Sequence, residues 1–196
     1  WDVKRGSGIR LGNSHNNTIS GNTLVKFQYG IHANASSNNI ICENNVMTTS
    51  AGLYIEESVN NTIYRNDIVD NYCGIRLIKS PYNSIYENNI AGNQDGIILA
   101  VSSNNKIYHN NFKNNINQVN DIGPTNYGGI TSIIVWDDGY PSGGNYWSDY
   151  TGFDLHCGPY QNKTGSDGIG DTPYVINAAN IDRYPFFPSL TIITNF

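Results

Sequence analysis

Apolar and polar residues alternate over short stretches of the first 120 residues, and the alternation itself repeats every 22 residues. Each repeat is marked by a glycine followed by an aliphatic residue, and the phase is kept by serine, isoleucine and mixed apolar columns. No stretch has the three-or-four spacing of a helix, so the pattern predicts short strands separated by turns. The columns are Gly8, Gly30, Gly52, Gly74 and Gly96; Ser14, Ser36, Ser58, Ser80 and Ser102; Ile19, Ile41, Ile63, Ile85 and Ile107; and Leu24, Val46, Ile68, Ile90 and Phe112.

Five repeats without an insertion predict a solenoid. A period near 22 with three short strands is that of one coil of a parallel β-helix, in which each coil covers the apolar face of its neighbour. We therefore predict an all-β protein with a right-handed parallel β-helix over residues 1–120. An irregular β and loop cap over residues 121–196 should pack on the solenoid and end in a β-strand tail.

Two asparagine columns share the period, and parallel stacking places equivalent residues about 4.8 Å apart. Asparagine tolerates left-handed backbone angles, and its amide can bond the identical amide one coil away. We therefore interpret these asparagines as a structural ladder and not as ligands. They are Asn17, Asn39, Asn61, Asn83 and Asn105, and Asn22, Asn44, Asn66, Asn88 and Asn110.

Charge, hydropathy and cysteine spacing limit the binding partners and metal sites that this chain can have. The net charge is −5 and no cluster of lysines and arginines occurs, which argues against nucleic acid or an anionic membrane as a partner. The longest apolar runs, such as residues 130–136, are too short to span a bilayer, so we predict no transmembrane segment. Cys42, Cys73 and Cys157 lack the spacing of a zinc site, which leaves idle thiols or one disulfide involving Cys157.

Four N-x-S/T sequons begin at Asn16, Asn34, Asn60 and Asn162 and suit an extracellular glycoprotein. We expect a secreted or cell-surface protein whose leader has already been removed, because the chain opens on Trp1 without a basic or apolar leader.

The repeat phrases "GIRL", "GIHA", "GLYI" and "GIIL" resemble those of the NosD-like and the carbohydrate-binding or sugar-hydrolase β-helix families, as found in archaeal surface proteins. The resemblance covers about residues 6–120, and it implies the fold without implying an activity. The words "GNYWSDY", "DGIGDTPY" and "DRYP" are similar to the segment that follows the repeats in such surface proteins. They are matched by residues 144–154, 167–174 and 182–185.

Four aspartates within residues 121–196 indicate a metal site. Asp167 and Asp171 lie four residues apart on a glycine-rich loop, after Asp149 and Asp154. Carboxylates and main-chain carbonyls on a bent loop are the usual ligands of Ca²⁺ in proteins, so we predict a structural calcium site. The alternative is that the four aspartates cap turns by accepting bonds from backbone N–H groups.

Copper would need His, Met or Cys ligands. The four histidines and the single methionine are scattered along the chain, so we expect no copper.

One outward column carries groups suited to catalysis or binding. Arg10, His32, Tyr54 and Arg76 share the 22-residue phase, because Ile75 and Leu77 point inward and leave Arg76 outward. A cation, an imidazole and a phenol in line could hold an acidic polysaccharide. No pair of carboxylates flanks the column as glycoside hydrolysis requires, so we lean against an enzyme. The alternative is an ordinary solvated face.

Two functions from different classes remain. The first is a non-catalytic extracellular building block that assembles with itself into a surface layer, sheath or filament. It rests on the short stretch before Gly8, which could barely cap a coil, and on the strand-like ending "SLTIITNF". The second is a carbohydrate-binding or polysaccharide-active β-helix protein that uses the Arg/His/Tyr column.

Overall fold

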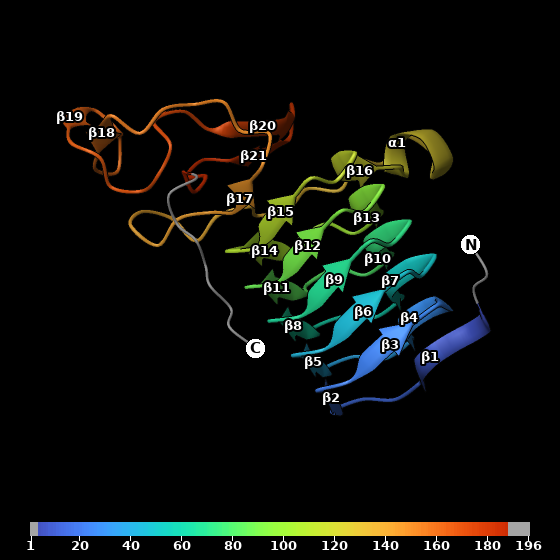
Figure 1. The fold of residues 1–196 in the computed structure, drawn as a ribbon. Helices are drawn as coiled ribbons and strands as arrows, with labels where there is room; N and C mark the ends of the chain where they lie inside the picture. Colours follow the sequence, from blue (N-terminus) through green and yellow to red (C-terminus); the bar gives the residue numbers. More distant parts are fainter. Residues whose placement is uncertain (1–3, 188–196) are drawn as a thin grey trace.

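The structure, a computed structural model, describes residues 4–187 and confirms the parallel β-helix with coils of 22 residues (Figure 1). Three parallel sheets run along the stack, and each coil contributes one short strand to each sheet. Within the stack the paired residues are 22 apart, as in Ile31 with Leu53 and Leu53 with Ile75. The exceptions are Lys4 with Phe27 on the first strand and the pairing of residues 111–112 with 146–147, where the cap joins sheet C. The period seen in the sequence is therefore the register of the fold.

The strands of each sheet follow in spatial order. Sheet A consists of β1 (Lys4–Gly12), β4 (Phe27–Asn34), β7 (Ala51–Glu56), β10 (Cys73–Ile78), β13 (Asp95–Ala100) and β16 (Asn117–Asp121). Sheet B consists of β14 (Lys106–Tyr108), β11 (Ser84–Tyr86), β8 (Thr62–Tyr64), β5 (Ile40–Cys42) and β2 (Thr18–Ser20). Sheet C consists of β17 (Tyr146–Trp147), β15 (Asn111–Lys113), β12 (Asn89–Ala91), β9 (Asp67–Val69), β6 (Asn45–Met47) and β3 (Thr23–Val25).

The core is formed by the inward residues of all three sheets, and the isoleucine column and most of the mixed apolar column are fully buried. The glycine column is required by close packing at the start of each sheet A strand. A Cβ added at Gly52 would lie 2.7 Å from the carbonyl oxygen of Gly74 and 2.7 Å from Cγ2 of Ile68. Both distances are too short for a carbon atom, so any larger residue would push adjacent coils apart.

The asparagine columns form continuous ladders in the buried turns. Asn66 donates from its backbone N–H (3.0 Å) and from Nδ2 (2.9 Å) to Oδ1 of Asn88, and Asn88 donates in the same way to Asn110. Nδ2 of Asn88 also reaches the carbonyl of Ile63 at 3.0 Å. Each amide thus satisfies polar backbone groups of its own coil and of the neighbouring coils, which would otherwise be buried without partners.

The left-handed backbone angles belong to the residues that precede the ladder asparagines. Arg65, Glu87 and His109 have φ angles of 53°, 55° and 55°, each directly before an asparagine of the second column. The ladder asparagines themselves are absent from the residues with positive φ. The left-handed conformation expected of the ladder asparagines is therefore adopted by the residues that precede them, and the amides serve as hydrogen-bonding groups.

The cap follows β16 and closes one end of the stack. It contains α1 (Gly123–Asn126) and two small antiparallel pairs, β18 (His156–Cys157) with β19 (Lys163–Thr164), and β20 (Tyr174–Asn177) with β21 (Asn180–Asp182). Trp136 and Trp147 are buried against Phe112, and the Phe112 and Trp147 rings stack at 4.4 Å. The cap thus supplies the apolar surface that another coil would have supplied.

The cap also ends one asparagine ladder. Asn110 donates from its backbone N–H to Oδ1 of Asn145 at 3.0 Å, and Asn145 donates in turn to Oδ2 of Asp182 at 2.7 Å. Asp182 is fully buried and also accepts a bond from Nε1 of Trp147 at 2.9 Å. Burial raises the pKa of this carboxyl to about 7, against the opposing effect of its N–H donors.

Three further predictions concern the chain ends and the thiols. The predicted strand in "SLTIITNF", residues 189–196, lies outside the described residues. All three cysteines are free thiols, so the disulfide alternative for Cys157 is not formed. Within residues 4–187, no helix has the length and apolar character needed to cross a membrane.

Replacing Asn88 by alanine should destabilise the solenoid by roughly 2 to 4 kcal/mol, because the N–H groups of Asn66 and the carbonyl of Ile63 lose a buried partner. Urea unfolding monitored by circular dichroism would measure the change. The matched control is Asn162→Ala at an exposed position of the cap, which should change stability by less than about 0.5 kcal/mol. Equal effects of the two substitutions would contradict a structural role for the ladder.

Candidate functional site

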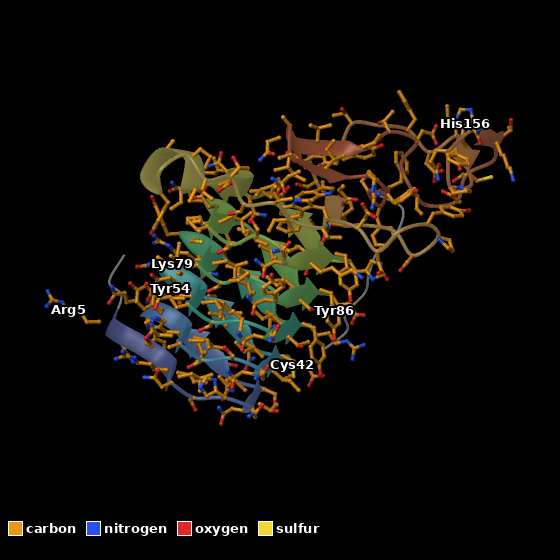
Figure 2. All side chains as sticks on the ribbon, turned by 180° about the vertical axis from the view of Figure 1, so that it is seen from behind. Arg5, Cys42, Tyr54, Lys79, Tyr86 and His156 are labelled. Carbon is orange, nitrogen blue, oxygen red and sulfur yellow. The ribbon has the colours of Figure 1, made fainter. Side chains whose placement is uncertain are left out.

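The register of sheet A brings the four residues of the predicted column into one line on its outer face. Arg10 pairs with His32, His32 with Tyr54, and Tyr54 with Arg76 on successive strands. We call this line the sheet A column. Figure 2 shows Tyr54 on one flank of the stack and Tyr86 of sheet B on the opposite flank. The column therefore lies on a different face from Tyr86, and the cap reaches this face through Ile122, which packs on the cluster of Ala51, Cys73 and Ile98 beside Tyr54.

The side chains of the sheet A column stack on one another along the solenoid axis. The rings of His32 and Tyr54 are parallel within 7°, with centroids 4.8 Å apart. The guanidinium of Arg76 lies 5.4 Å from the Tyr54 ring centre on the following strand. Because the faces of Tyr54 are covered by these neighbours, it offers a ligand its edge and its hydroxyl. Recognition at this face would rest on hydrogen bonds and charge.

Two polar atoms of the column are buried without a hydrogen-bond partner, namely Nε2 of His32 and Nε of Arg76. Glu56, two residues after Tyr54 on β7, lies beside the first of these atoms: its Oε2 accepts a bond from Nδ2 of Asn34 at 3.2 Å and is 3.8 Å from His32 Nε2. Unpartnered buried polar atoms are rare and indicate bound water or a ligand. These two atoms are therefore the strongest sign of a binding function on this face.

One carboxylate, that of Glu56, lies beside the column, where the sequence indicated no flanking pair. Glu56 and Glu57 are neighbours in the sequence and were expected to point to opposite sides. The structure separates them: Glu57 has a φ of 47° and pairs with Lys79 at 3.2 Å, whereas Glu56 joins the outer face of sheet A. The available signal was the spacing of two between Tyr54 and Glu56 on one strand, which places both on one face.

Burial and neighbouring charges keep the column's imidazole and phenol neutral. The pKa of His32 is lowered by burial and by the Arg10 guanidinium, with Glu56 opposing both. Burial and the Glu56 carboxylate raise the pKa of Tyr54 to about 12. The charged side chains of this face are the guanidiniums of Arg10 and Arg76 and the carboxylates of Glu56 and Asp95, of which Asp95 is buried and held by Asn117 and Asn120, so the guanidiniums are the charged groups left to meet an anionic ligand.

Sheet B carries a second ladder of outward aromatic residues, Tyr64, Tyr86 and Tyr108. Their rings stack at 5.3 and 5.4 Å, with interplanar angles of 5° and 19°. Each ring face is turned toward the neighbouring tyrosine, so the ladder presents ring edges. We assign it a structural role in holding sheet B together.

The four aspartates predicted to hold calcium are engaged by donors of the cap instead. Asp154 accepts bonds from the backbone N–H groups of Asp167 and Gly168 and from the Ser166 hydroxyl. Asp171 accepts bonds from the backbone N–H groups of Leu155 and His156 and lies 2.8 Å from the His156 imidazole. Asp167 accepts bonds from the backbone N–H groups of Gly158 and Ile169. Asp149 accepts a bond from the Tyr174 hydroxyl. Within residues 4–187, no three His, Cys, Asp or Glu side chains are grouped to hold a metal ion. The turn-capping alternative describes this geometry.

Potential copper ligands are likewise spread over the molecule. The soft donors Cys42, Met47 and Cys73 lie on sheets B, C and A, respectively. His156 lies in the cap, where its Nδ1 is 2.8 Å from Asp171 Oδ2. The described residues thus offer no assembled copper site, and we derive no chemistry through a metal.

The sequon asparagines differ in exposure. Asn16, Asn60 and Asn162 are exposed, whereas Asn34 is half-buried and donates to Glu56. Glycosylation at these positions stays a prediction.

Comparison with known proteins identifies a family. A family model described as "Periplasmic copper-binding protein (NosD)" matches residues 3–152, which include the whole solenoid and the first part of the cap. No curated protein matches the chain. Our expectation of calcium and no copper is therefore wrong, because the matching family is described as copper-binding and the aspartates form no metal-binding group.

Replacing Glu56 by glutamine should lower the pKa of His32 further, because the carboxylate is the group that raises it. Since the folded pKa of His32 already lies below 6.5, the unfolded chain binds more protons, and stability from this group is lost as the pH falls through that window. An NMR titration of the imidazole would measure the shift. Glu57→Gln is the matched control and should leave His32 unchanged; a raised His32 pKa in Glu56→Gln would contradict the contact.

Proposed function

Because the chain belongs to the NosD family, we propose that it is an exported, non-catalytic β-helix protein that binds an acidic polysaccharide along the sheet A column. The carrying observation is the pair of unpartnered buried atoms, His32 Nε2 and Arg76 Nε, next to two guanidiniums. The export part of the proposal is supported by the word "periplasmic" in the family description and by the exposed sequons.

The spacing of the column supports a linear ligand. Successive strands place Arg10, His32, Tyr54 and Arg76 about 4.8 Å apart along one line. A chain that runs parallel to the solenoid axis can touch each of them in turn. Guanidinium groups form paired, charge-assisted hydrogen bonds with carboxylates, which is the group that distinguishes an acidic polysaccharide from a neutral one.

The state of the carboxylates supports binding without bond cleavage. Glycoside hydrolysis uses two carboxyl groups on either side of the scissile bond. Here the column itself contains no carboxylate, Glu56 is held by Asn34, and Asp95 is buried and held by Asn117 and Asn120.

Self-association is the second candidate, and the first coil supports it. Within the described residues, the outer edges of β1, β2 and β3 pair with no strand, and Ile9 and Leu11 are only half-buried there. Open strand edges accept further strands. At the other end Trp136 and Trp147 cover the core, and among residues 4–187 the outer edge of β16 also pairs with no strand. The first coil offers three such edges against this one, so association by strand addition would use the first coil. Assembly into a surface layer, sheath or filament would build on such contacts.

Replacing Arg76 by methionine should weaken binding of polygalacturonate by about tenfold, because it removes one charge-assisted fork worth about 1.4 kcal/mol and retains an apolar stem against Tyr54. Isothermal titration calorimetry on the whole chain would measure it, with dextran as the neutral polymer. Lys163→Met, an equal loss of charge on the exposed β19, should bind as the unchanged chain does. Equal affinities in both variants, or equal binding of dextran, would exclude the proposed role.

Self-association should appear as a mass that increases with protein concentration in static light scattering. Lysines at the exposed positions Thr18 and Thr23 on the edge strands should return the chain to monomer mass, because like charges repel across a paired edge. Thr164→Lys on the cap is the control and should leave association intact. Monomer mass for the unchanged chain at every concentration would reject this candidate.

A further inference from the structure

The outer face of sheet C is hollowed into a groove that is separate from the sheet A column. One hollow has a volume of about 500 Å³ and is lined by Asp70, Glu87, Asn89, Ala91 and Lys113, among others. A second, smaller hollow, lined by Asn45 and Asp67 among others, lies on the same face nearer the first coil. We call the two together the sheet C groove. It is large enough to hold two or three sugar-sized units.

The shape of the groove follows from short strands and one small residue. Each inner strand of sheet C has three residues, the middle one points into the core, and only the first and third face outward. The third residues of successive strands form one outward column, which consists of Val69, Ala91 and Lys113. Because Ala91 is the smallest of the three, the surface is hollowed at its position.

The floor of the sheet C groove is a second ladder of side-chain amides, distinct from the buried one. Asn89 Nδ2 donates to Asp67 Oδ1 at 2.6 Å, and Asn111 Nδ2 donates to Asn89 Oδ1 at 2.8 Å. Asn45 Oδ1, one coil before Asp67, is buried and has no partner. An amide can make four hydrogen bonds, so each rung retains donors or acceptors for a ligand.

Carboxylates predominate in the lining. Glu87 is paired with Arg65 at 2.7 Å, which neutralises both side chains. Glu43, Asp67 and Asp70 then remain against the single cation of Lys113. The groove therefore does not attract an anion, unlike the sheet A column with its two guanidiniums, and its carboxylates add hydrogen-bond acceptors.

These features exclude most classes of ligand for the sheet C groove. An anionic polymer would meet the carboxylates of Asp67 and Asp70. A peptide strand adds to the edge of a sheet, and this groove lies on a sheet face whose strands are paired on both sides. A wholly apolar ligand would cover amides and carboxylates without satisfying them, which is costly.

We propose that the sheet C groove binds a neutral saccharide chain that runs along the solenoid axis. A sugar hydroxyl can donate one hydrogen bond and accept others at the same time. This matches the floor of the groove, which offers hydrogen-bond donors and acceptors in each coil. The C–H face of a sugar ring would cover Val69 and Ala91, where the floor is apolar. The proposal is independent of acidic polysaccharide binding at sheet A, since it uses other residues on another face.

The test is an NMR titration of the ¹⁵N-labelled chain with neutral hexasaccharides of glucose, mannose and galactose as probes. We expect at least one probe to shift the side-chain amide signals of Asn89 and Asn111, with a Kd of about 1 mM or lower. Ala91→Phe fills the hollow from outside the core and should abolish these shifts, whereas Ala91→Ser keeps the hollow and should retain them. Asn111→Ala removes one rung at a half-exposed position and should weaken binding several-fold.

Three outcomes would overturn the proposal. The first is an absence of shifts in the groove with every probe at about 10 mM. The second is unchanged binding in both Ala91→Phe and Asn111→Ala, each checked for native circular dichroism. The third is a set of shifts confined to residues 30–34 and 54–56, which would place the saccharide on sheet A.

Discussion

Every turn of this solenoid buries polar backbone groups that water cannot reach, and the side-chain amide of asparagine satisfies them one coil at a time. Asn88 receives two bonds from Asn66 and donates to Asn110, so each rung is complete only when both neighbours are in register. This requirement holds the period at 22 residues and leaves no place for an insertion among the inner coils. The packing of Gly52 against Gly74 and the inward isoleucines depend on the same register.

The same register determines which chemistry the surface can present. Coils stack at about 4.8 Å, which is also a comfortable separation for stacked rings, so outward aromatic side chains cover each other's faces. His32 and Tyr54 therefore present edges and polar tips, and the tyrosines of sheet B do likewise. On sheet C, short amides cannot fill the space between coils and leave a groove. One architecture thus yields a line of guanidiniums and stacked rings on one face and a hollow lined by amides and carboxylates on another.

Spacing in the sequence was enough to predict the fold and the alignment of Arg10 with Arg76, because in a regular stack equal intervals become adjacent positions. It could not predict contacts that depend on side-chain direction. The approach of Glu56 to His32 is one such contact, although Glu56 lies two residues from Tyr54. The calcium prediction failed because the spacing of Asp154 and Asp171 says nothing about which backbone N–H groups approach them. The hollow at Ala91 likewise depends on its neighbours in space.

The buried asparagine ladder that runs from Asn22 to Asn110 has a direction. Every rung donates to the rung one coil nearer the cap, and the last donors, on Asn145 and Trp147, end on the buried carboxyl of Asp182. A carboxyl group retains acceptor capacity whether or not it is ionised, and burial raises the pKa of this one to about 7. The ladder is therefore a one-way row of bonds that needs an acceptor at its end. A gene duplication could lengthen it by whole coils in the interior, whereas a coil added beyond Asp182 would leave the final donors of that coil without an acceptor.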